Sequence, residues 1–178
     1  MAEDPNHPPV EGVRLSGAAR GTQDGARHSF LCVVDESEEL SQAVRFACRR
    51  AQGSGGRVAL LYVVEPADFE HWAAVGELMS EERRAEAEQR MHAVAAEVQA
   101  QTDEMPALYI REGKITEELI NLIDEETQVS SLVLGAATGT EGPGPLVSQL
   151  IGKMTGRVRV PITIVPGSLT DEQIDAIT

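Results

Sequence analysis

The sequence predicts an α/β fold, a five-stranded parallel doubly wound sheet of the Rossmann-like type flanked by four helices. Its segments between apolar runs are long enough for crossover helices and far longer than hairpin turns, which favours parallel strands with right-handed crossovers. A glycine-rich loop after the fourth run completes a strand, loop, helix, strand unit, and such sheets bind ligands beyond the carboxyl ends of their strands. The runs have the composition of buried strands and cover residues 30–34, 58–64, 107–110, 132–134 and 162–165.

Composition limits the classes of partner. The chain has 178 residues, of which 42% are hydrophobic, and a net charge of -14, which suits one domain with an ordinary core. Because this charge repels phosphate backbones and anionic lipid, we expect neither nucleic acid nor a membrane as partner. No stretch approaches a membrane span and the N-terminus lacks a segment of the signal-peptide type, so we expect a cytoplasmic protein. Cys32 and Cys48 lack metal-site spacing and are interpreted as core residues.

The chain divides into an arm, a domain and a tail. Residues 1–27 combine prolines, glycines and scattered charges with almost no large apolar residue, which predicts a disordered N-terminal arm. The domain covers residues 28–167. Residues 168–178 are polar and acidic, and we expect at most a loose helical turn there.

The first strand stops at Asp35 and a helix follows. Asp35 with Glu38, or Ser37 itself, could cap this helix at its N-terminus, and Gly55 lies where it should end. Its apolar residues recur at helical spacing: Leu40, Ala43, Val44, Ala47, Cys48 and Ala51.

The segment after the second strand is irregular. Residues 67–79 contain Trp72 beside His71 and predict a short helix or a lid; we interpret the pair as packing residues, with cover for a ligand or a dimer contact as the alternative. Ser80 is predicted to cap the longest helix, which is rich in strong helix formers. Its apolar side is Ala87, Met91, Val94, Ala95 and Val98.

Two further helices complete the predicted fold. Gly113 and Lys114 turn the third strand into a helix that carries Ile115, Leu119, Ile120 and Ile123. Lys114 could bind a phosphate, but we interpret it as a solvated turn residue. The fourth helix has apolar steps of three, four, three and four at Val147, Leu150, Ile151, Met154 and Val158.

The order of these pieces resembles the universal stress protein family over about residues 28–166. The segments that carry the resemblance are VVDESEE at 33–39, YVVEP at 62–66, EGKITEELI at 112–120, LVLGAATG at 132–139 and VPITIVP at 160–166. The family's nucleotide-binding members carry a signature of glycine, two residues, glycine, nine residues, then glycine followed by serine or threonine.

Aligned from Gly135, this signature is degenerate. Its second glycine is replaced by Thr138 and its third by Ser148, with Gln149 in the hydroxyl position. The resemblance also places the family's adenine contacts on Asp35 and Val63. These six residues form the candidate cofactor site, for ATP or another adenine nucleotide.

The replacements predict weakened or lost triphosphate binding. Thr138 adds a branched side chain where a phosphate would lie. Ser148 is less damaging, because serine suits a helix N-terminus and its hydroxyl can donate to an anion. The remaining loop glycines could supply a rearranged cradle, but Pro143 and Pro145 remove backbone donors from it.

Three functions follow from the resemblance. The first is a regulatory or interaction homodimer that pairs through the last strand, residues 162–165. The alternative is a nucleotide-binding switch that holds ATP or a related adenine nucleotide. An enzyme lacks support, because the serine- and glycine-rich phosphate loop of related ATP pyrophosphatases is replaced by Asp35, Glu36 and Ser37, so we expect no catalytic residues and no metal site.

Overall fold

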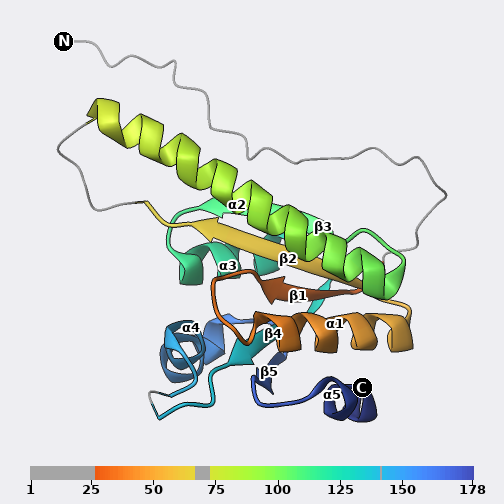
Figure 1. Ribbon diagram of the computed structural model, residues 1–178. Coiled ribbons are helices and arrows are strands. Elements are labelled where there is room, and N and C mark those ends of the chain that lie inside the picture. The colour runs from red at the N-terminus through yellow and green to blue at the C-terminus, as the bar shows by residue number, and fades with distance from the viewer. Residues whose placement is uncertain (1–26, 67–72, 141) are drawn as a thin grey trace.

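The fold is built on one parallel sheet. The computed structural model describes residues 27–66, 73–140 and 142–178, with the backbone alone at 73–80 and 153–155. The strand order is β3-β2-β1-β4-β5 and every pair is parallel, so the predicted five-stranded parallel sheet is confirmed (Figure 1). The strands are β1 (Ser29–Val33), β2 (Arg57–Val64), β3 (Ala107–Glu112), β4 (Val129–Ala136) and β5 (Ile162–Pro166).

Helices cover both faces of the sheet. One face packs against α1 and α2, the other against α3 and α4, and α5 lies beside α1 (Figure 1). Their bounds are α1 (Leu40–Ser54), α2 (Ala73–Thr102), α3 (Ile115–Glu125), α4 (Pro145–Gln149) and α5 (Asp171–Ile177).

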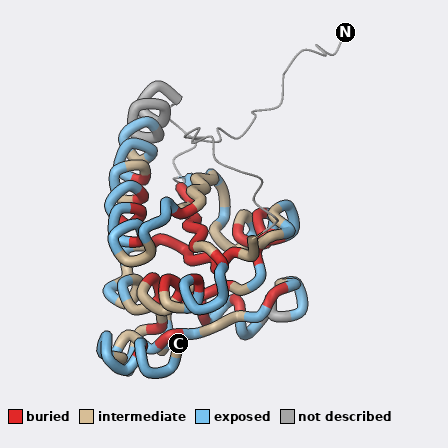
Figure 2. The backbone as a smooth tube through the Cα atoms, turned by 90° about the vertical axis from the view of Figure 1, so that its right-hand side faces the viewer, coloured by how far each residue is buried: buried red, intermediate tan, exposed pale blue. Residues whose placement is uncertain are grey.

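Each strand contributes to two cores. Along β1, Phe30 and Cys32 point toward α1 and α2, while Leu31 and Val33 point toward α3 and α4. This alternation is the period of two that a strand imposes on its side chains. The strands read as continuous apolar runs because both faces are covered, and Figure 2 shows the buried residues gathered in the interior.

The start of α1 differs from the prediction. Its N-cap position is Glu39, which makes no side-chain capping hydrogen bond, so the predicted cap by Asp35 or Ser37 is wrong. Asp35 Oδ1 instead accepts hydrogen bonds from the Ser37 amide at 3.0 Å and the Ser37 hydroxyl at 2.6 Å. The two residues satisfy each other in a local turn, which leaves neither side chain for the helix end. The predicted end is confirmed, because Gly55 is left-handed with φ 69.

The longest helix starts earlier than predicted. α2 begins at Ala73, so the expected start at Ser80 is wrong. The segment AAVGELM before Ser80 contains no proline, and a serine does not stop a helix that strong helix formers continue on both sides. The pair His71 and Trp72 lies outside the described residues. Although α2 is long, no helix in the described ranges is also apolar enough to cross a membrane.

The predicted fourth helix is not one regular helix. α4 changes into a π-helix, η1 (Leu150–Met154), and then a 3-10 turn, η2 (Thr155–Arg157). Val147 and Leu150 are buried as predicted, but Ile151 is 52% exposed. The wider π turn changes the angle between successive side chains, so spacing for a 3.6-residue period no longer marks one face.

The C-terminal segment is more ordered than the expected loose turn. α5 begins with a capping box in which the Thr170 hydroxyl accepts from the Gln173 amide and the Gln173 side chain accepts from the Thr170 amide. Ile174 is completely buried. Asp175 accepts hydrogen bonds from both Arg45 and Arg49 on α1. Burial of one apolar side chain and this ion-pair cluster together dock the segment.

Candidate functional site

The candidate site lies at the carboxyl ends of β1 and β4, where the connections of neighbouring strands leave toward opposite faces of the sheet. β1 leads into α1 on one face and β4 leads into α4 on the other, so the connections of these neighbouring strands diverge at their carboxyl ends. This arrangement is the switch point at which open α/β sheets bind ligands. A cleft of about 100 Å³ opens there. Of the six predicted site residues, Asp35 and Gly135 line this cleft.

Asp35 is held by its own turn. The side chain is half-buried at the end of β1, and its Oδ1 accepts both hydrogen bonds from Ser37. Oδ2 accepts no hydrogen bond from the described residues. The turn therefore fixes the carboxylate and leaves one oxygen able to accept from a ligand hydroxyl or amine.

Gly135 serves a close approach between two loops. A Cβ atom at this position would lie 2.5 Å from the carbonyl oxygen of Glu39 and 2.8 Å from its carbonyl carbon. A Cβ atom at Gly167, just after β5, would lie 2.8 Å from the Cβ of Glu39. The carbonyl group of Glu39 is therefore packed against Gly135, and the Cβ atom of Glu39 against Gly167, so both positions require glycine for packing.

Three of the predicted site residues after Gly135 lie outside the cleft. Thr138, Ser148 and Gln149 are exposed, and within the described chain the cleft is lined after Gly135 by residues 143–147 instead. The Ser148 amide donates to the carbonyl of Gly144 at 3.1 Å, so it is already used inside the helix. The side chain of Thr138 therefore does not narrow the space beside Asp35.

Val63 is a buried strand residue. Its side chain is 9% exposed and packs in the core between the sheet and the α3 and α4 layer. In the sheet it is in register with Arg111 of β3. Val63 does not line the cleft at the ends of β1 and β4 in the described chain.

The start of α3 already holds an anion. Glu65 Oε1 accepts a hydrogen bond of 3.2 Å from the amide of Ile115, the first residue of this helix. Lys114 is exposed and pairs with Glu117 at 3.6 Å. A carboxylate at a helix N-terminus is favourable, so Glu65 already satisfies one of the free amides at the start of α3. Lys114 lies in the solvated turn that we predicted for it.

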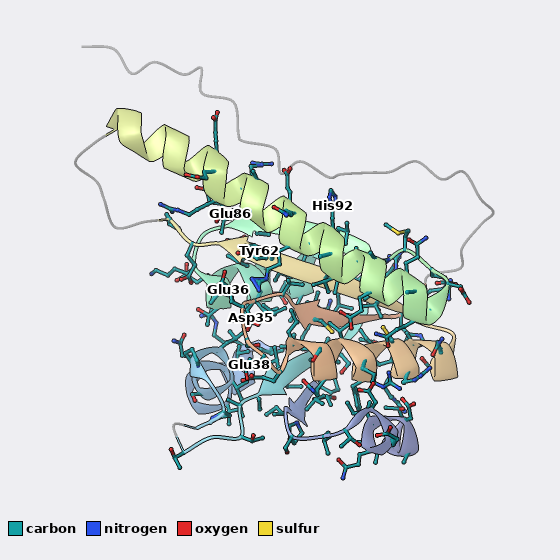
Figure 3. The ribbon with its side chains drawn as sticks, in the orientation of Figure 1. Asp35, Glu36, Glu38, Tyr62, Glu86 and His92 are labelled. Atoms are coloured by element: carbon teal, nitrogen blue, oxygen red, sulfur yellow. The ribbon has the colours of Figure 1, made fainter. Side chains whose placement is uncertain are left out.

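The carboxyl edge of the sheet is strongly acidic. Asp35, Glu36 and Glu38 lie together on the turn after β1 (Figure 3), and Glu39 completes it. The turn carries one ion pair in the described chain, between Glu36 and Arg90 at 3.3 Å. Negative potential disfavours a polyanion. No group of three or more metal-ligating side chains occurs among the described residues.

The cysteines are core residues, as predicted. Both are buried without a disulfide. Burial, and secondarily the nearby Cys48 thiol, raises the pKa of Cys32 far above its usual value. Burial raises the pKa of Cys48 to about 12, with a smaller contribution from Glu97. Since the thiolate is the reactive form, neither side chain is a nucleophile at neutral pH.

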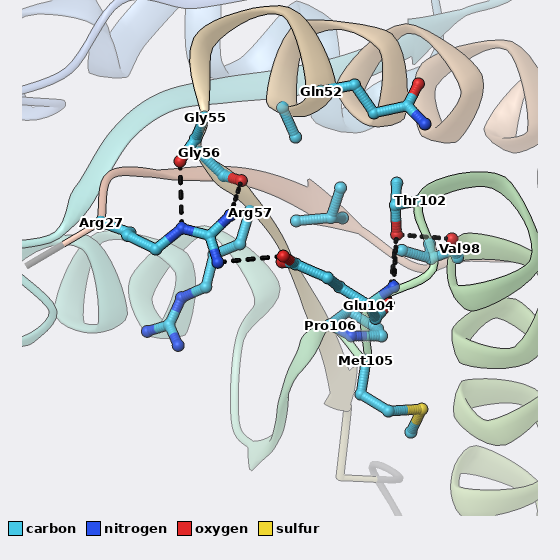
Figure 4. Close-up of a pocket in the computed structure, with 12 residues that line it drawn as sticks. Arg27, Gln52, Gly55, Gly56, Arg57, Val98, Thr102, Glu104, Met105 and Pro106 are labelled. Atoms are coloured by element: carbon cyan, nitrogen blue, oxygen red, sulfur yellow. Dashed lines mark hydrogen bonds and ion pairs between the residues drawn. The ribbon is translucent and has the colours of Figure 1, made fainter. Parts of the chain in front are cut away.

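A second hollow lies at the opposite edge of the sheet. It has a volume of about 220 Å³ between the end of α1 and the start of β3, and Figure 4 shows Arg27 beside it. The Arg27 guanidinium donates to the carbonyls of Gly55 and Gly56 and pairs with Glu104 at 3.0 Å. Arg27, which we assigned to the disordered arm, thus fastens the beginning of the domain to two later segments.

Sequence reasoning missed the residues that limit the cleft. Glu39 gave no signal, because its importance comes from contact with Gly135, far away in the chain. Pro143 and Pro145 were noted for their missing amides, but they also form part of the cleft wall. Two prolines at the start of the helix, one before it and one as its first residue, were the signal that could have pointed to this wall.

Comparisons with known proteins agree on one family. A model of the universal stress protein family matches residues 27–166. No curated protein sequence matches the chain. Universal stress protein UspA from Lactobacillus plantarum is similar in structure, with TM-score 0.64, 21% identity and coverage of 80% of this chain and 99% of that one.

Two nucleotide complexes have the same fold at lower similarity. A universal stress protein from Archaeoglobus fulgidus in complex with dAMP gives TM-score 0.58, 12% identity and coverage of 79% of this chain and 99% of that one. A universal stress protein in complex with cAMP gives TM-score 0.51, 20% identity and coverage of 81% and 100%. At these identities the likeness concerns the fold.

Proposed function

The chain belongs to the universal stress protein family, and from this premise we propose that it acts as a regulatory or interaction homodimer whose ATP binding is weakened or lost. The observation that carries this proposal is the size of the cleft at the switch point, about 100 Å³. Pockets that enclose drug-sized ligands have about 300–1,000 Å³. A base, a ribose and three phosphates need a space in that range.

The walls of the cleft support the same conclusion. The carbonyl of Glu39 covers Gly135, and Pro143 and Pro145 stand opposite without amide donors. The nearby acids of the turn after β1 repel a triphosphate. What remains at the switch point is a shallow acidic surface, which suits contact with another protein better than enclosure of a polyanion.

The edge of the sheet supports the dimer. In the strand order β5 has β4 as its neighbour on one side, with no further strand beyond it in the described chain. Ile164 on this strand is 37% exposed, unusual for a large apolar side chain in a sheet. An uncovered edge strand offers main-chain donors and acceptors to a second strand.

The alternative function is an adenine-nucleotide switch. It is supported by relatives whose structures contain dAMP and cAMP, both of which carry fewer phosphates than ATP. It is also supported by Asp35, which lines the cleft and whose Oδ2 atom accepts no hydrogen bond from the described residues. A monophosphate in a cleft that opens on binding would suit these two observations.

The decisive experiment is to identify small molecules that co-purify with the full chain by native mass spectrometry, and then to titrate ATP, AMP and cAMP by calorimetry. We expect no stoichiometric nucleotide and no saturable ATP binding below millimolar concentration, roughly 4 kcal/mol of binding free energy. Tight stoichiometric ATP would overturn the proposal, and tight AMP or cAMP alone would establish the alternative.

Two double variants identify the cause of weak binding. Thr138→Gly with Ser148→Gly restores the family's glycines, whereas Pro143→Ala with Pro145→Ala restores two amides in the cleft wall. Because the prolines line the cleft and Thr138 and Ser148 do not, we expect the proline variant to gain more ATP affinity. A larger gain in the glycine variant would show that the degenerate signature is responsible.

A further inference from the structure

A third hollow of the described chain is a groove far from the switch point. It has a volume of about 480 Å³ and lies at the amino ends of β1, β4 and β5, between α1 and the last turn of α5. This volume falls in the range of small-molecule sites. Ligands of α/β sheets usually bind at the carboxyl edge, so the groove is separate from the switch-point cleft, although Thr163 of the proposed dimer strand lines it.

Apolar side chains make the floor and one wall of the groove. Phe30, at 7% exposure, lies at its base, and Phe46 on α1 is half-buried beside it. Ile177 at the end of α5 is 61% exposed and forms the rim. When the apolar part of a ligand covers solvent-exposed apolar side chains of this kind, the burial of their surface favours binding.

The groove is also lined by a cation, Arg50. Phe46, Arg50 and Ser54 follow one another at four-residue spacing, so they lie on a single line along α1. No hydrogen bond or ion pair joins the Arg50 side chain to any other described residue. By contrast Arg45 and Arg49, on the adjacent line of the same helix, are both held by Asp175.

The three serine hydroxyl groups of the groove already make hydrogen bonds within the protein. The Ser54 hydroxyl donates to the carbonyl of Arg50 at 2.6 Å and lies 2.9 Å from His28 Nε2. The hydroxyls of Ser130 and Ser131 donate to main-chain carbonyls of Ser29 and Pro161. Thr163 also lines the groove, and the guanidinium of Arg50 carries the positive charge that can match a single anionic group.

We infer that the groove binds a small amphipathic organic anion: one carboxylate or sulfonate pairs with Arg50, and an aromatic or alkyl body covers Phe30, Phe46 and Ile177. Charge complementarity selects this occupant, because a guanidinium that no carboxylate of the described residues pairs with can form charge-assisted hydrogen bonds with an anion. A polyphosphate does not fit this chemistry, since the groove offers one guanidinium. The inference is independent of nucleotide binding at the other edge.

The test compares two probes of the same shape. Anilinonaphthalenesulfonate carries a sulfonate, and N-phenylnaphthylamine has the same rings without it; both increase in fluorescence on apolar surfaces. We expect saturable binding of the sulfonate to the folded full chain, and Arg50→Gln should weaken it about five- to tenfold. The uncharged probe should change by less than about twofold in that variant, because its contacts do not involve the guanidinium.

A matched variant and a mapping experiment complete the test. Arg84→Gln makes the same charge change at an exposed position on α2, where Arg84 pairs with Glu88, and should leave both affinities unchanged. Shifts in the amide NMR spectrum at Phe46, Arg50 and Ser54 upon titration would support the inference. It is overturned if the sulfonate does not bind saturably, if Arg50→Gln and Arg84→Gln weaken it equally, or if a second copy of the chain covers these amides.

Discussion

The carbonyl oxygen of Glu39 lies so close to Gly135 that a Cβ atom at residue 135 would come within 2.5 Å of it. This contact joins the turn after β1 to the end of β4. It explains, without any ligand, why residue 135 is a glycine. The family resemblance interprets the same glycine as a phosphate contact. Packing against Glu39 and contact with a phosphate both require a residue without a side chain, so the presence of glycine does not distinguish these two interpretations.

Gly135→Ala should destabilise the fold by displacing the turn at Glu39. The oxygen that a Cβ would meet belongs to the main chain and cannot rotate away, so we expect a loss of about 1–3 kcal/mol in the free energy of unfolding, measured by denaturant titration. Gly139→Ala is the matched control, because a Cβ there has no atom within 4 Å. Equal stability of the two variants would contradict the contact.

The docking of α5 should depend on Ile174. This side chain is completely buried, whereas Ile177 on the same helix is 61% exposed. Ile174→Ala should cost about 2 kcal/mol or more and accelerate amide hydrogen exchange in residues 171–177. Ile177→Ala removes the same atoms from an exposed position. If α5 packs as described, this variant should lose much less stability than Ile174→Ala and leave the hydrogen exchange of residues 171–177 nearly unchanged.

Acid should release the ion-pair cluster between α5 and α1. Hydrogen bonds from Arg45 and then Arg49 lower the pKa of Asp175 below its usual value, so the folded state favours the carboxylate. Its stabilising contribution is therefore complete above the pKa of the unfolded chain, about 3.9, and disappears as pH falls through the lower folded value. Hydrogen exchange in residues 171–177, followed from pH 7 downward, should show faster opening only in this acid range.

Asp175→Asn isolates this group from its neighbours. Glu97 on α2 acts in the opposite direction, because burial and then Asp171 raise its pKa, and it contributes stability that is lost as pH rises. The variant should remove the increase in hydrogen exchange that protonation of Asp175 causes in acid. The pH dependence of stability that comes from Glu97 should remain. An unchanged acid step would exclude Asp175 as its origin.

The dimer proposal predicts that charge on β5 separates two copies. Ile164→Asp adds a carboxylate at a side chain that is 37% exposed in one chain and would be covered in a dimer, so dimerisation should weaken by about tenfold or more in sedimentation velocity. Met105→Asp makes the same kind of change at a 58% exposed residue before β3 and should have no effect. Unaffected assembly in Ile164→Asp, or a monomeric parent chain, would contradict pairing through β5.

Much of the fold could be predicted because its signals are local. The apolar runs that became β1 and β2 are visible in a few consecutive residues, and the left-handed Gly55 ended α1 where expected. Boundaries set by competition were missed: Ser80 did not start α2, and Asp35 bonded to Ser37 in place of the helix. In these cases more than one local conformation satisfies the same residues.

The sequence by itself determined the five parallel strands, the helices between them, the buried cysteines and the family pattern that ends at Pro166. Only the tertiary structure decided how wide the switch-point cleft is, where Thr138 and Ser148 lie, and that α5 docks on α1. The physical reason is that periodicity and turn chemistry are properties of neighbouring residues. The space beside Asp35 depends instead on how closely Glu39 approaches Gly135 across the sheet, which no single segment encodes.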